Sequence, residues 1–476
     1  MLYHIQKNKH SLILKITVMK RVHFIAIGGA AMHNLAIALS NKRDFIVTGS
    51  DDEIFEPSLS RLKEHKLLPD KFGWFPDEHI TKKLDAVILG MHAKEDNPEL
   101  IRAKELGIKI YSFPEYLYEQ SRSKTRIVIG GSHGKTTTTA MILFVLKQLN
   151  FNPDYMVGAQ IEGFDNMVKL SYESRVAVFE GDEYLTSPID RRPKFHLYKP
   201  HIAVLTGIAW DHINVFPTFD IYMEQFRKFI DLMEPQGRLI YYAGDENLKK
   251  IAEHLRSDII DFSYNTPKHE IRNGITYLQT KKGEVPLKIF GEHNLQNLEA
   301  ARLVCRQIGV SDLSFYDAIK NFTGASNRMQ KIAETATSVA FKDFAHSPSK
   351  LQATVKAVRE QYPDRKIIAC MELHTFSSLT KDFLPQYVGC MTEADTAFVY
   401  YSPEVVQHKC LAEINPEQVK SAFGGENLTV FTDTTLLQKK LKSLNYDNAV
   451  LLMMSSGNFS GIDVAAFAGE LVSKHR

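Results

Sequence analysis

The chain has 476 residues, of which 44% are hydrophobic and 24% are charged, and its formal net charge is +2. This length exceeds one ordinary hydrophobic core, so we expect about two to four domains. The small net charge gives no reason to expect a nucleic-acid partner or an anionic membrane surface. The four cysteines are scattered without CxxC spacing, which is typical of reduced thiols in a cytoplasmic protein.

Residues 1–20 are interpreted as a disordered leader. Their short apolar run is interrupted by Lys15, and no small-residue cleavage site follows it. Met19 stands just before the first predicted strand and is a natural alternative start. No apolar run in the chain reaches the length of a membrane span, so we expect no membrane insertion.

Residues 21–121 are predicted to form a first α/β domain. Its strands are expected at 21–28, 45–51, 86–90 and 108–111, with a helix at 30–39. Strands that alternate with helices are typical of a parallel, doubly wound sheet.

A glycine turn follows the first predicted strand and consists of Gly28, Gly29, Ala30, Ala31 and Met32. It resembles a dinucleotide-binding turn, but alanines replace the first and last glycines of GxGxxG. The second strand ends at Ser50 and Asp51, about where a ribose-binding acid would lie. These residues therefore favour a ligand that carries a diphosphate and only weakly support NAD.

A second glycine-rich loop lies between the apolar run 127–129 and a helix that continues from Ala140. Its G-x-x-G-K-T spacing is shorter than the common GxxxxGK[ST] pattern. Backbone N–H groups of such a turn can cradle phosphate oxygens, Lys135 can reach the β- and γ-phosphates, and Thr136 can hold Mg²⁺. A plain structural turn is the weaker alternative. The predicted ATP-binding residues of the loop are Gly131, Ser132, His133, Gly134, Lys135, Thr136 and Thr137.

The loop opens a second predicted domain, residues 122–327, with strands at 177–179, 202–206 and 239–242, a small antiparallel insert at 260–290 and a helix at 295–308. Glu180, Asp182 and Glu183 close the first of these strands, where carboxylates suit Mg²⁺. A solvated acidic turn is the alternative. His212 follows the next strand and could bind a second metal, although a lone loop histidine is more often structural.

Two further motifs have both functional and structural interpretations. Asn294 and Asn297 share one helix face and could contact an adenine edge, but an asparagine at a helix start is often only a cap. The third predicted domain, residues 328–476, has strands at 339–341, 366–370, 396–400 and 449–453. Asp343 follows the first of them and could accept a ribose hydroxyl or simply belong to a loop.

Taken together and in order, these motifs resemble the Mur ligase family of cell-wall synthesis. The resemblance is carried by G-S-H-G-K-T-T-T at 131–138, E-G-D-E-Y at 180–184, W-D-H-I-N at 210–214, G-E-H-N-x-x-N at 291–297 and D-F-A-H-S-P at 343–348. It covers about residues 21–476.

The resemblance implies three domains: a Rossmann-like N-terminal domain, a central P-loop ATPase-type α/β domain and a C-terminal Rossmann-like α/β domain. It also implies an ATP- and Mg²⁺-dependent ligase that acts through an acyl phosphate. The first domain would bind a UDP-sugar through the glycine turn with Ser50 and Asp51. The implied catalytic and metal residues are Lys135, Thr136, Glu180 and His212, and the implied further ATP contacts are His293, Asn294, Asn297, Arg328 and Asp343.

The position where several members carry a carbamylated lysine is Phe226 or Arg227 here, which favours the branch that acts on UDP-N-acetylmuramate. Within it, the segments 183–195 and 455–462 resemble the members that attach the recycled tripeptide L-Ala-γ-D-Glu-meso-diaminopimelate. The alternative is the biosynthetic addition of L-alanine. The sequence does not decide whether the third residue of the peptide is diaminopimelate or lysine. It also does not decide whether the protein is a monomer or a dimer.

The residues implied in peptide binding are Arg191, Arg192, His346 and His374. The first two could equally form a solvated basic face. His374 stands where the tripeptide-adding members have arginine, and an imidazole cannot form a bidentate fork with a carboxylate. An ATP-binding regulatory protein and a nucleotide-dependent oxidoreductase are less favoured alternatives for the whole chain.

Overall fold

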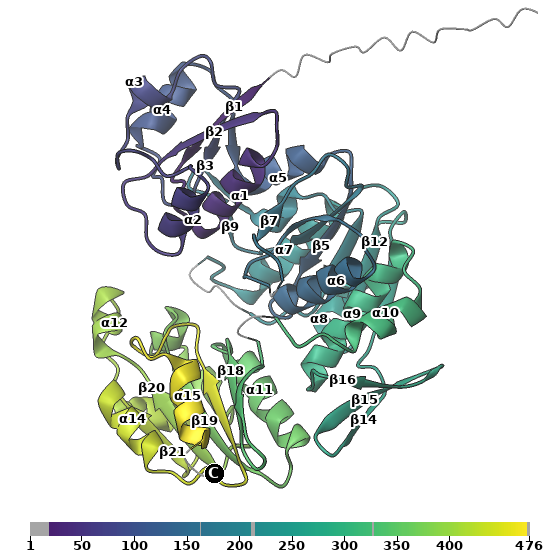
Figure 1. Cartoon of the computed structure of the whole chain (residues 1–476), viewed down its shortest axis with the longest axis vertical. Helices are drawn as coiled ribbons and strands as arrows, with labels where there is room; N and C mark the ends of the chain where they lie inside the picture. Colours follow the sequence, from purple (N-terminus) through teal and green to yellow (C-terminus); the bar gives the residue numbers. More distant parts are fainter. Residues whose placement is uncertain (1–18, 162, 211–214, 326–327, 474–476) are drawn as a thin grey trace, which may run out of the picture. The chain divides into compact units, whose positions relative to one another are not determined.

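The computed structural model describes residues 19–161, 163–210, 215–325 and 328–473. Nearly all of the predicted leader and the predicted metal ligand His212 lie outside these residues. The chain forms two compact units, one with residues up to Tyr116 and Ser187–Asp190, the other with Leu117–Thr186 and all residues from Arg191. The α/β fold class is confirmed, since parallel strands alternate with helices in each of three larger sheets (Figure 1).

The first unit contains a four-stranded parallel sheet in the order β2-β1-β3-β4. The strands are β1 (Lys20–Ile25), β2 (Phe45–Ser50), β3 (Ala86–Leu89) and β4 (Ile110–Ser112), and the helices are α1 (Ala30–Ser40), α2 (Ser58–Glu64), α3 (Pro76–His79), α4 (Pro98–Glu105) and α5 (Phe113–Ser121), the last of which continues into the second unit. The predicted strands and the first helix are therefore confirmed. Asn97 caps α4 by accepting from two backbone N–H groups, which fixes where this helix begins.

The second unit begins with a seven-stranded sheet in the order β13-β12-β11-β5-β8-β6-β7. Only β7 is antiparallel to its neighbour. The strands are β5 (Thr125–Gly130), β6 (Asp154–Met156), β7 (Val168–Lys169), β8 (Val176–Glu180), β11 (Ile202–Leu205), β12 (Arg238–Tyr242) and β13 (Ile260–Tyr264). Their central members are continuous apolar runs because both faces of the sheet are covered.

Helices α6 (Lys135–Gln148), α7 (Phe219–Asp231), α8 (Glu246–Ala252), α9 (Glu292–Gln307) and α10 (Asp312–Ile319) belong to the same part of the chain. A two-stranded sheet pairs β9 (Leu185–Ser187) with β10 (Asp190–Pro193), and a short 3-10 turn, η1 (Lys194–Leu197), follows. None of the described helices combines the length and the apolar character needed to span a membrane.

The expected antiparallel insert is present but shorter than predicted. It consists of β14 (His269–Arg272), β15 (Ile275–Thr280) and β16 (Gly283–Leu287). The prediction was wrong for residues 260–264, which form β13 and pair in parallel with β12. The mixture of buried and exposed residues in β13 is similar to that of an exposed hairpin strand. It arises because β13 is the edge strand of the large sheet.

The last sheet has six strands in the order β17-β18-β22-β19-β20-β21, and only β17 is antiparallel. The strands are β17 (Gln330–Glu334), β18 (Val339–Asp343), β19 (Lys366–Glu372), β20 (Thr396–Tyr400), β21 (Leu428–Phe431) and β22 (Ala449–Met454). The helices are α11 (Pro348–Gln361), α12 (Pro403–His408), α13 (Pro416–Phe423), α14 (Thr434–Lys442) and α15 (Val464–Ser473), with 3-10 turns η2 (Ser377–Leu379) and η3 (Leu384–Tyr387).

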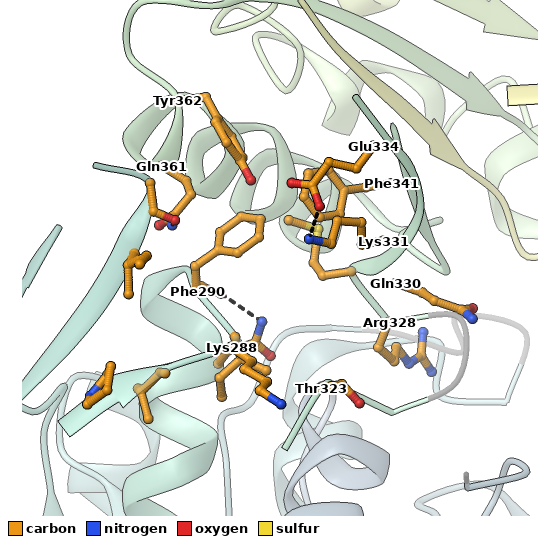
Figure 2. Close-up of a pocket in the computed structure, with 18 of the residues that line it drawn as sticks. Lys288, Phe290, Thr323, Arg328, Gln330, Lys331, Glu334, Phe341, Gln361 and Tyr362 are labelled. Carbon is orange, nitrogen blue, oxygen red and sulfur yellow. Dashed lines mark hydrogen bonds and ion pairs between the residues drawn. The ribbon is translucent and has the colours of Figure 1, made fainter. Parts of the chain in front are cut away.

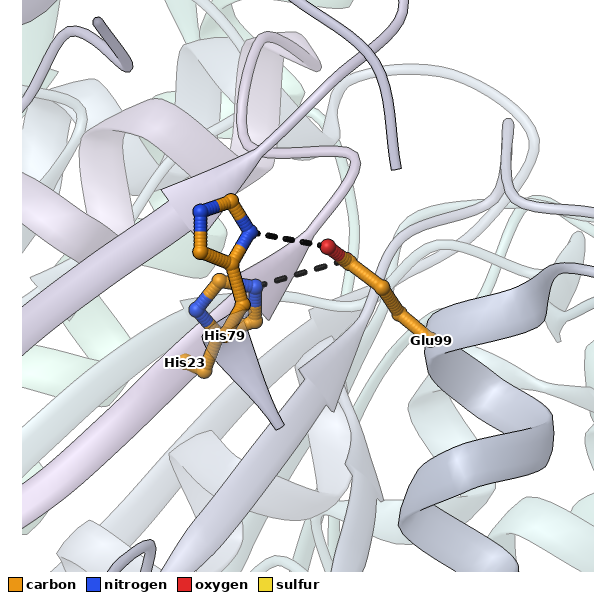
Figure 3. A group of neighbouring side chains, drawn as sticks. All are labelled: His23, His79 and Glu99. Atoms are coloured by element: carbon orange, nitrogen blue, oxygen red, sulfur yellow. Dashed lines mark hydrogen bonds and ion pairs between the residues drawn. The ribbon is translucent and has the colours of Figure 1, made fainter. Parts of the chain in front are cut away.

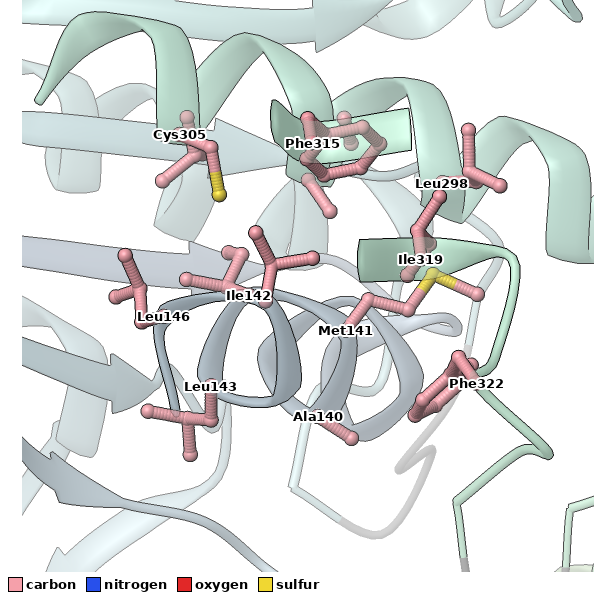
Figure 4. Packing of buried hydrophobic residues seen from close by; sticks show 14 of the residues in the cluster. Ala140, Met141, Ile142, Leu143, Leu146, Leu298, Cys305, Phe315, Ile319 and Phe322 are labelled. Carbon is pink, nitrogen blue, oxygen red and sulfur yellow. The ribbon is translucent and has the colours of Figure 1, made fainter. Parts of the chain in front are cut away.

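The core beneath the glycine-rich loop holds α6 in place. Apolar side chains of α6 pack against α9 and α10, as Figure 4 shows for Met141, Ile142, Leu298 and Phe315. These four side chains are at most 1% exposed. The position of the α6 N-terminus therefore depends on this cluster.

Truncation of this core should cost stability. Phe315→Ala should lower the free energy of unfolding by about 3–5 kcal/mol, because it removes buried apolar area and leaves a cavity. Leu313→Ala on the same helix is the matched control, since Leu313 is 48% exposed and should cost less than about 0.5 kcal/mol. Urea unfolding would measure both, and equal losses in the two variants would contradict this packing.

Candidate active site

The glycine-rich loop lies between β5 and α6, as predicted. Gly131 and Gly134 have φ angles of +128° and +80°, which favour glycine over residues with a Cβ atom. A side chain at Gly131 would collide with Thr206, and one at Gly134 would collide with Asn297. The loop is thus held close to β11 and α9, and its N–H groups remain grouped at the start of a helix.

Lys135 is the first residue of α6, and its ammonium is compensated within the loop. Its Nζ donates to the Gly131 carbonyl at 2.7 Å and forms an ion pair with Glu183 Oε2 at 2.7 Å. Burial acts to lower the pKa of Lys135, but the carboxylates of Glu183 and Asp182 outweigh it and hold this pKa above its usual range. Lys135 is therefore a fixed cation at the place where phosphate oxygens would bind.

Thr136 and Glu180 converge beside this cation. The Thr136 hydroxyl donates to Glu180 Oε1 at 2.8 Å, and the Gly158 N–H donates to Glu180 Oε2 at 2.7 Å. Burial and the nearby Asp182 raise the pKa of Glu180. Hard oxygen donors around a buried carboxylate fit Mg²⁺. The positive charge of the ion would lower the pKa of Glu180 and so offset the effects of burial and of Asp182.

The two asparagines of α9 have different partners. Asn297 Oδ1 accepts from the Thr138 hydroxyl at 3.2 Å and so links α9 to α6. Asn294 Nδ2 donates to the Phe290 carbonyl at 2.8 Å. Both side chains nevertheless line the same cavity as the loop, together with His293.

His133 is partly buried inside the loop. Burial lowers its pKa to about 4, with further contributions from Lys350, Lys135 and His293. Its Nδ1 is buried and has no hydrogen-bond partner among the described residues. A neutral imidazole beside the phosphate-binding turn can donate or accept one hydrogen bond without adding charge.

Asp343 organises the other wall of the cavity. It ends β18 and accepts from the N–H groups of Met329 at 2.6 Å and Ala345 at 2.8 Å. Arg328 lies beside it, with its guanidinium carbon 4.4 Å from the centre of the Phe344 ring. Burial lowers the pKa of Arg328, and the Asp343 carboxylate opposes that shift. His346 also lines this wall.

These groups enclose a cavity of about 760 Å³. Its lining contains predicted site residues from the loop, the acidic strand end, α9 and the β18 loop: Ser132, His133, Gly134, Lys135, Thr136, Thr137, Glu180, His293, Asn294, Asn297, Arg328, Asp343 and His346. A second cavity of about 1230 Å³ shares Asn294, Arg328 and Met329 with the first, and its other walls come mainly from the insert, the segment after α10, β17 and the residues at and after the end of α11 (Figure 2). It lacks the phosphate-binding loop, so the smaller cavity is the candidate active site.

Several lining residues were absent from the predicted binding set. Glu183 compensates Lys135, and Gly158 fixes Glu180. Glu183 belongs to an acidic cluster that was recognised, but only the fold pairs it with Lys135. Gly158 and Lys350 gave no usable signal in one sequence, because neither stands in a motif with a chemical requirement.

In the first unit, the glycine turn and Asp51 form one structure. The Gly28 N–H donates to Asp51 Oδ2 at 2.7 Å, and a side chain at Gly28 would meet Asp51 and Ile54. Burial raises the pKa of Asp51 to about 6, and the neighbouring Asp52 acts in the same direction. The hydrogen bond from the Gly28 N–H acts to lower this pKa but is outweighed. Ala30 is exposed at the start of α1, and Ser50 is buried beside Asp51.

The predicted peptide-binding residues do not form one cluster. Arg191 and Arg192 lie exposed on β10 and do not line the cavity. His374 follows β19, with Nδ1 3.8 Å from Glu372 Oε1. A side chain at Gly457 would collide with the His374 ring, so His374 lies against the segment 455–462.

Comparison with known proteins gives the same domain order. The Mur ligase family, catalytic domain matches residues 21–125, the Mur ligase middle domain 129–305, and the Mur ligase, glutamate ligase domain 327–457. The UDP-N-acetylmuramate–L-alanine ligase of Caldicellulosiruptor saccharolyticus is 32% identical over 394 residues, which covers 80% of this chain and 83% of the relative. That of Carboxydothermus hydrogenoformans is 28% identical, with 94% and 96% covered.

Two solved structures share the fold. The UDP-N-acetylmuramate-alanine ligase of Thermotoga maritima has a TM-score of 0.68 at 20% identity and covers 96% of this chain and 99% of its own. The murein peptide ligase of Psychrobacter arcticus has a TM-score of 0.64 at 22% identity and covers 95% and 99%. The predicted three-domain architecture is confirmed, and the chain belongs to the Mur ligase family of ATP-dependent amide ligases.

Proposed function

We propose that this ligase joins a free peptide, L-Ala-γ-D-Glu-meso-diaminopimelate, to UDP-N-acetylmuramate and so serves peptidoglycan recycling in the cytoplasm. The observation that carries the proposal is the arrangement after β8. Lys194 Nζ lies 4.0 Å from the centre of the Tyr184 ring and 3.4 Å from Asp182 Oδ2. Asp182 and Tyr184 line the cavity, and Lys194 directly follows β10, so these contacts hold the end of β10 near the acidic side of the cavity.

The exposed side chains of Arg191 and Arg192 on β10 suit the additional carboxylates that distinguish the tripeptide from L-alanine. The segment 455–462 and His374, which pack together, are a second candidate contact for the peptide. The segments 183–195 and 455–462 lie where the sequence resembles the tripeptide-adding members, whereas His374 replaces their arginine.

The proposed reaction has two steps. A carboxylate oxygen of UDP-N-acetylmuramate attacks the γ-phosphorus of ATP, and the bond to the β,γ-bridging oxygen breaks to give an acyl phosphate and ADP. The peptide amine then attacks the acyl carbon, loses a proton and expels inorganic phosphate, which leaves an amide. Exclusion of water from the acyl phosphate is essential to the second step.

The residues of the loop have separate tasks in the first step. Lys135 would exchange its contacts with Gly131 and Glu183 for phosphate oxygens and stabilise the charge that develops there. Thr136 and Glu180 would hold Mg²⁺, with His212 proposed for a second ion. The metal would neutralise phosphate charge and orient the oxygens.

The remaining predicted residues would bind the two nucleotides. Asn294, Asn297 and His293 would face the ATP base, and Arg328 and Asp343 the phosphates and ribose. In the first unit, the N–H groups at Gly28–Met32 would contact the UDP diphosphate, with Ser50 and Asp51 beside them. The N-terminal, central and C-terminal domains are proposed to span 21–121, 122–327 and 328–476.

The second candidate is the addition of L-alanine to UDP-N-acetylmuramate. It is favoured by the curated relatives, since those named above carry that activity in their names. ADP release with ATP, Mg²⁺, UDP-N-acetylmuramate and either amine separates the two. Turnover with L-alanine but not with the tripeptide would replace the first proposal by the second.

Replacement of the loop lysine should abolish most activity. Lys135→Met removes the cation that faces the γ-phosphate, and kcat should fall by about 10²–10³-fold or more. Lys147→Met, near the other end of α6, is the control, and its kcat should stay within about twofold of that of the unmodified enzyme. Amine-dependent ADP release measures both, and an active Lys135→Met variant would contradict the assigned role.

Replacement of the basic residues on β10 should weaken binding of the peptide rather than binding of ATP. The double change Arg191→Ser and Arg192→Ser should raise the KM for tripeptide about tenfold, equivalent to about 1.4 kcal/mol, and leave the KM for ATP unchanged. The exposed Arg175→Ser is the matched control. An unchanged KM for tripeptide would show that β10 is only a solvated face.

A further inference from the structure

Three side chains that are distant in sequence meet inside the first unit. His23 lies on β1, His79 ends α3, and Glu99 lies in the first turn of α4 (Figure 3). His23 Nε2 is 3.4 Å from Glu99 Oε2, and His79 Nδ1 is 2.9 Å from Glu99 Oε1. One ligand atom from each residue lies within 4.8 Å of the other two.

These separations suit a small tetrahedral cation. Zinc binds imidazole nitrogen and carboxylate oxygen at about 2.0–2.2 Å, so two of its ligands lie about 3.4 Å apart. The 3.4 Å separation at His23 already matches this value. The contact at His79 involves the other Glu99 oxygen, and one ligand atom of each residue lies within 4.8 Å of the others, so small shifts of these side chains would complete a three-sided site.

Neighbouring groups already orient the ligands. Thr48 Oγ1 lies 2.8 Å from His23 Nδ1, and when it accepts the ring proton there, Nε2 is left with a free lone pair. The Phe75 N–H donates to Glu99 Oε1 at 2.9 Å and fixes the carboxylate. Such partners on the far side of the ligands are typical of metal sites.

The site also has a route to solvent and a fourth donor. Side chains of His23 and Glu99 are at most 1% exposed, but that of His79 is 23% exposed. Ser50 Oγ lies 3.2 Å from His23 Nε2 and also donates to Glu99 Oε2. Either this hydroxyl or a water molecule could fill the remaining position.

We propose that His23, His79 and Glu99 form a structural site for a divalent transition metal, with Zn²⁺ the best match to two imidazoles and one carboxylate. The ion would tie α3, which has only four residues, to β1 and α4. Each imidazole would bind the metal through the nitrogen that faces Glu99 and carry its proton on the other nitrogen.

The competing explanation is a hydrogen-bond network without metal. Glu99 already accepts from Ser50 and the Phe75 N–H and contacts both imidazoles, which is enough partners for a buried carboxylate. The two explanations differ in whether added metal binds. They also predict different results when His79 is replaced by a side chain that still forms hydrogen bonds but binds metal weakly. The hydrogen-bond network would tolerate that change, whereas the metal site would not.

Titration of the metal-free full-length chain with Co²⁺ tests the proposal. We expect one ion per chain whose binding depends on His79, visible absorption of a four-coordinate Co²⁺ site that Zn²⁺ displaces, and a higher melting temperature with Zn²⁺. His79→Gln should lose the absorption and the thermal shift. His65→Gln, an exposed histidine of the same unit, should retain both.

Glu99→Gln provides a second variant, and far-UV circular dichroism checks that each variant is folded. No four-coordinate Co²⁺ absorption in the unmodified chain would overturn the proposal. So would equal absorption in folded His79→Gln. Amide-ligase activity is not part of this test, so its outcome is independent of the proposed function.

Discussion

A largely buried ammonium group at the start of α6 sets the main constraint on this molecule. Lys135 is held between the Gly131 carbonyl and the Glu183 carboxylate. Because a buried charge without a partner is costly, the loop and the end of β8 have to stay together. In the proposed reaction the phosphates of ATP would replace these partners, so the compensation that stabilises the loop would also prepare it for an anion.

The rest of the second unit supports this arrangement. β5, β8 and β11 are adjacent in the sheet, so their carboxyl ends bring the loop, Glu180 and Thr206 to one edge. Ligands of open parallel sheets bind at this edge. Tight packing of α6 against α9 and α10 then fixes the helix that carries Lys135 and Thr136. Catalysis by positioning needs that rigidity.

Local patterns predicted much of this fold, because strand–turn–helix units such as β5 to α6 are encoded by neighbouring residues. The β13 error arose because an edge strand and a hairpin strand share a half-exposed pattern. Long-range pairs could not be predicted from the sequence. Lys135 and Glu183 are separated by 48 residues, and His23 and Glu99 by 76. Only the assembled sheets bring such residues together, and neither pair has a local spacing that would reveal it.

The central claim is that the Lys135 loop transfers the γ-phosphoryl group to a carboxylate. UDP-N-acetylmuramate labelled with ¹⁸O in its carboxylate, supplied with ATP and tripeptide or L-alanine, tests this directly by mass spectrometry of the products. An acyl phosphate predicts that one ¹⁸O atom appears in the inorganic phosphate released. Amide formation with no label in phosphate, or with label in AMP, would contradict the account.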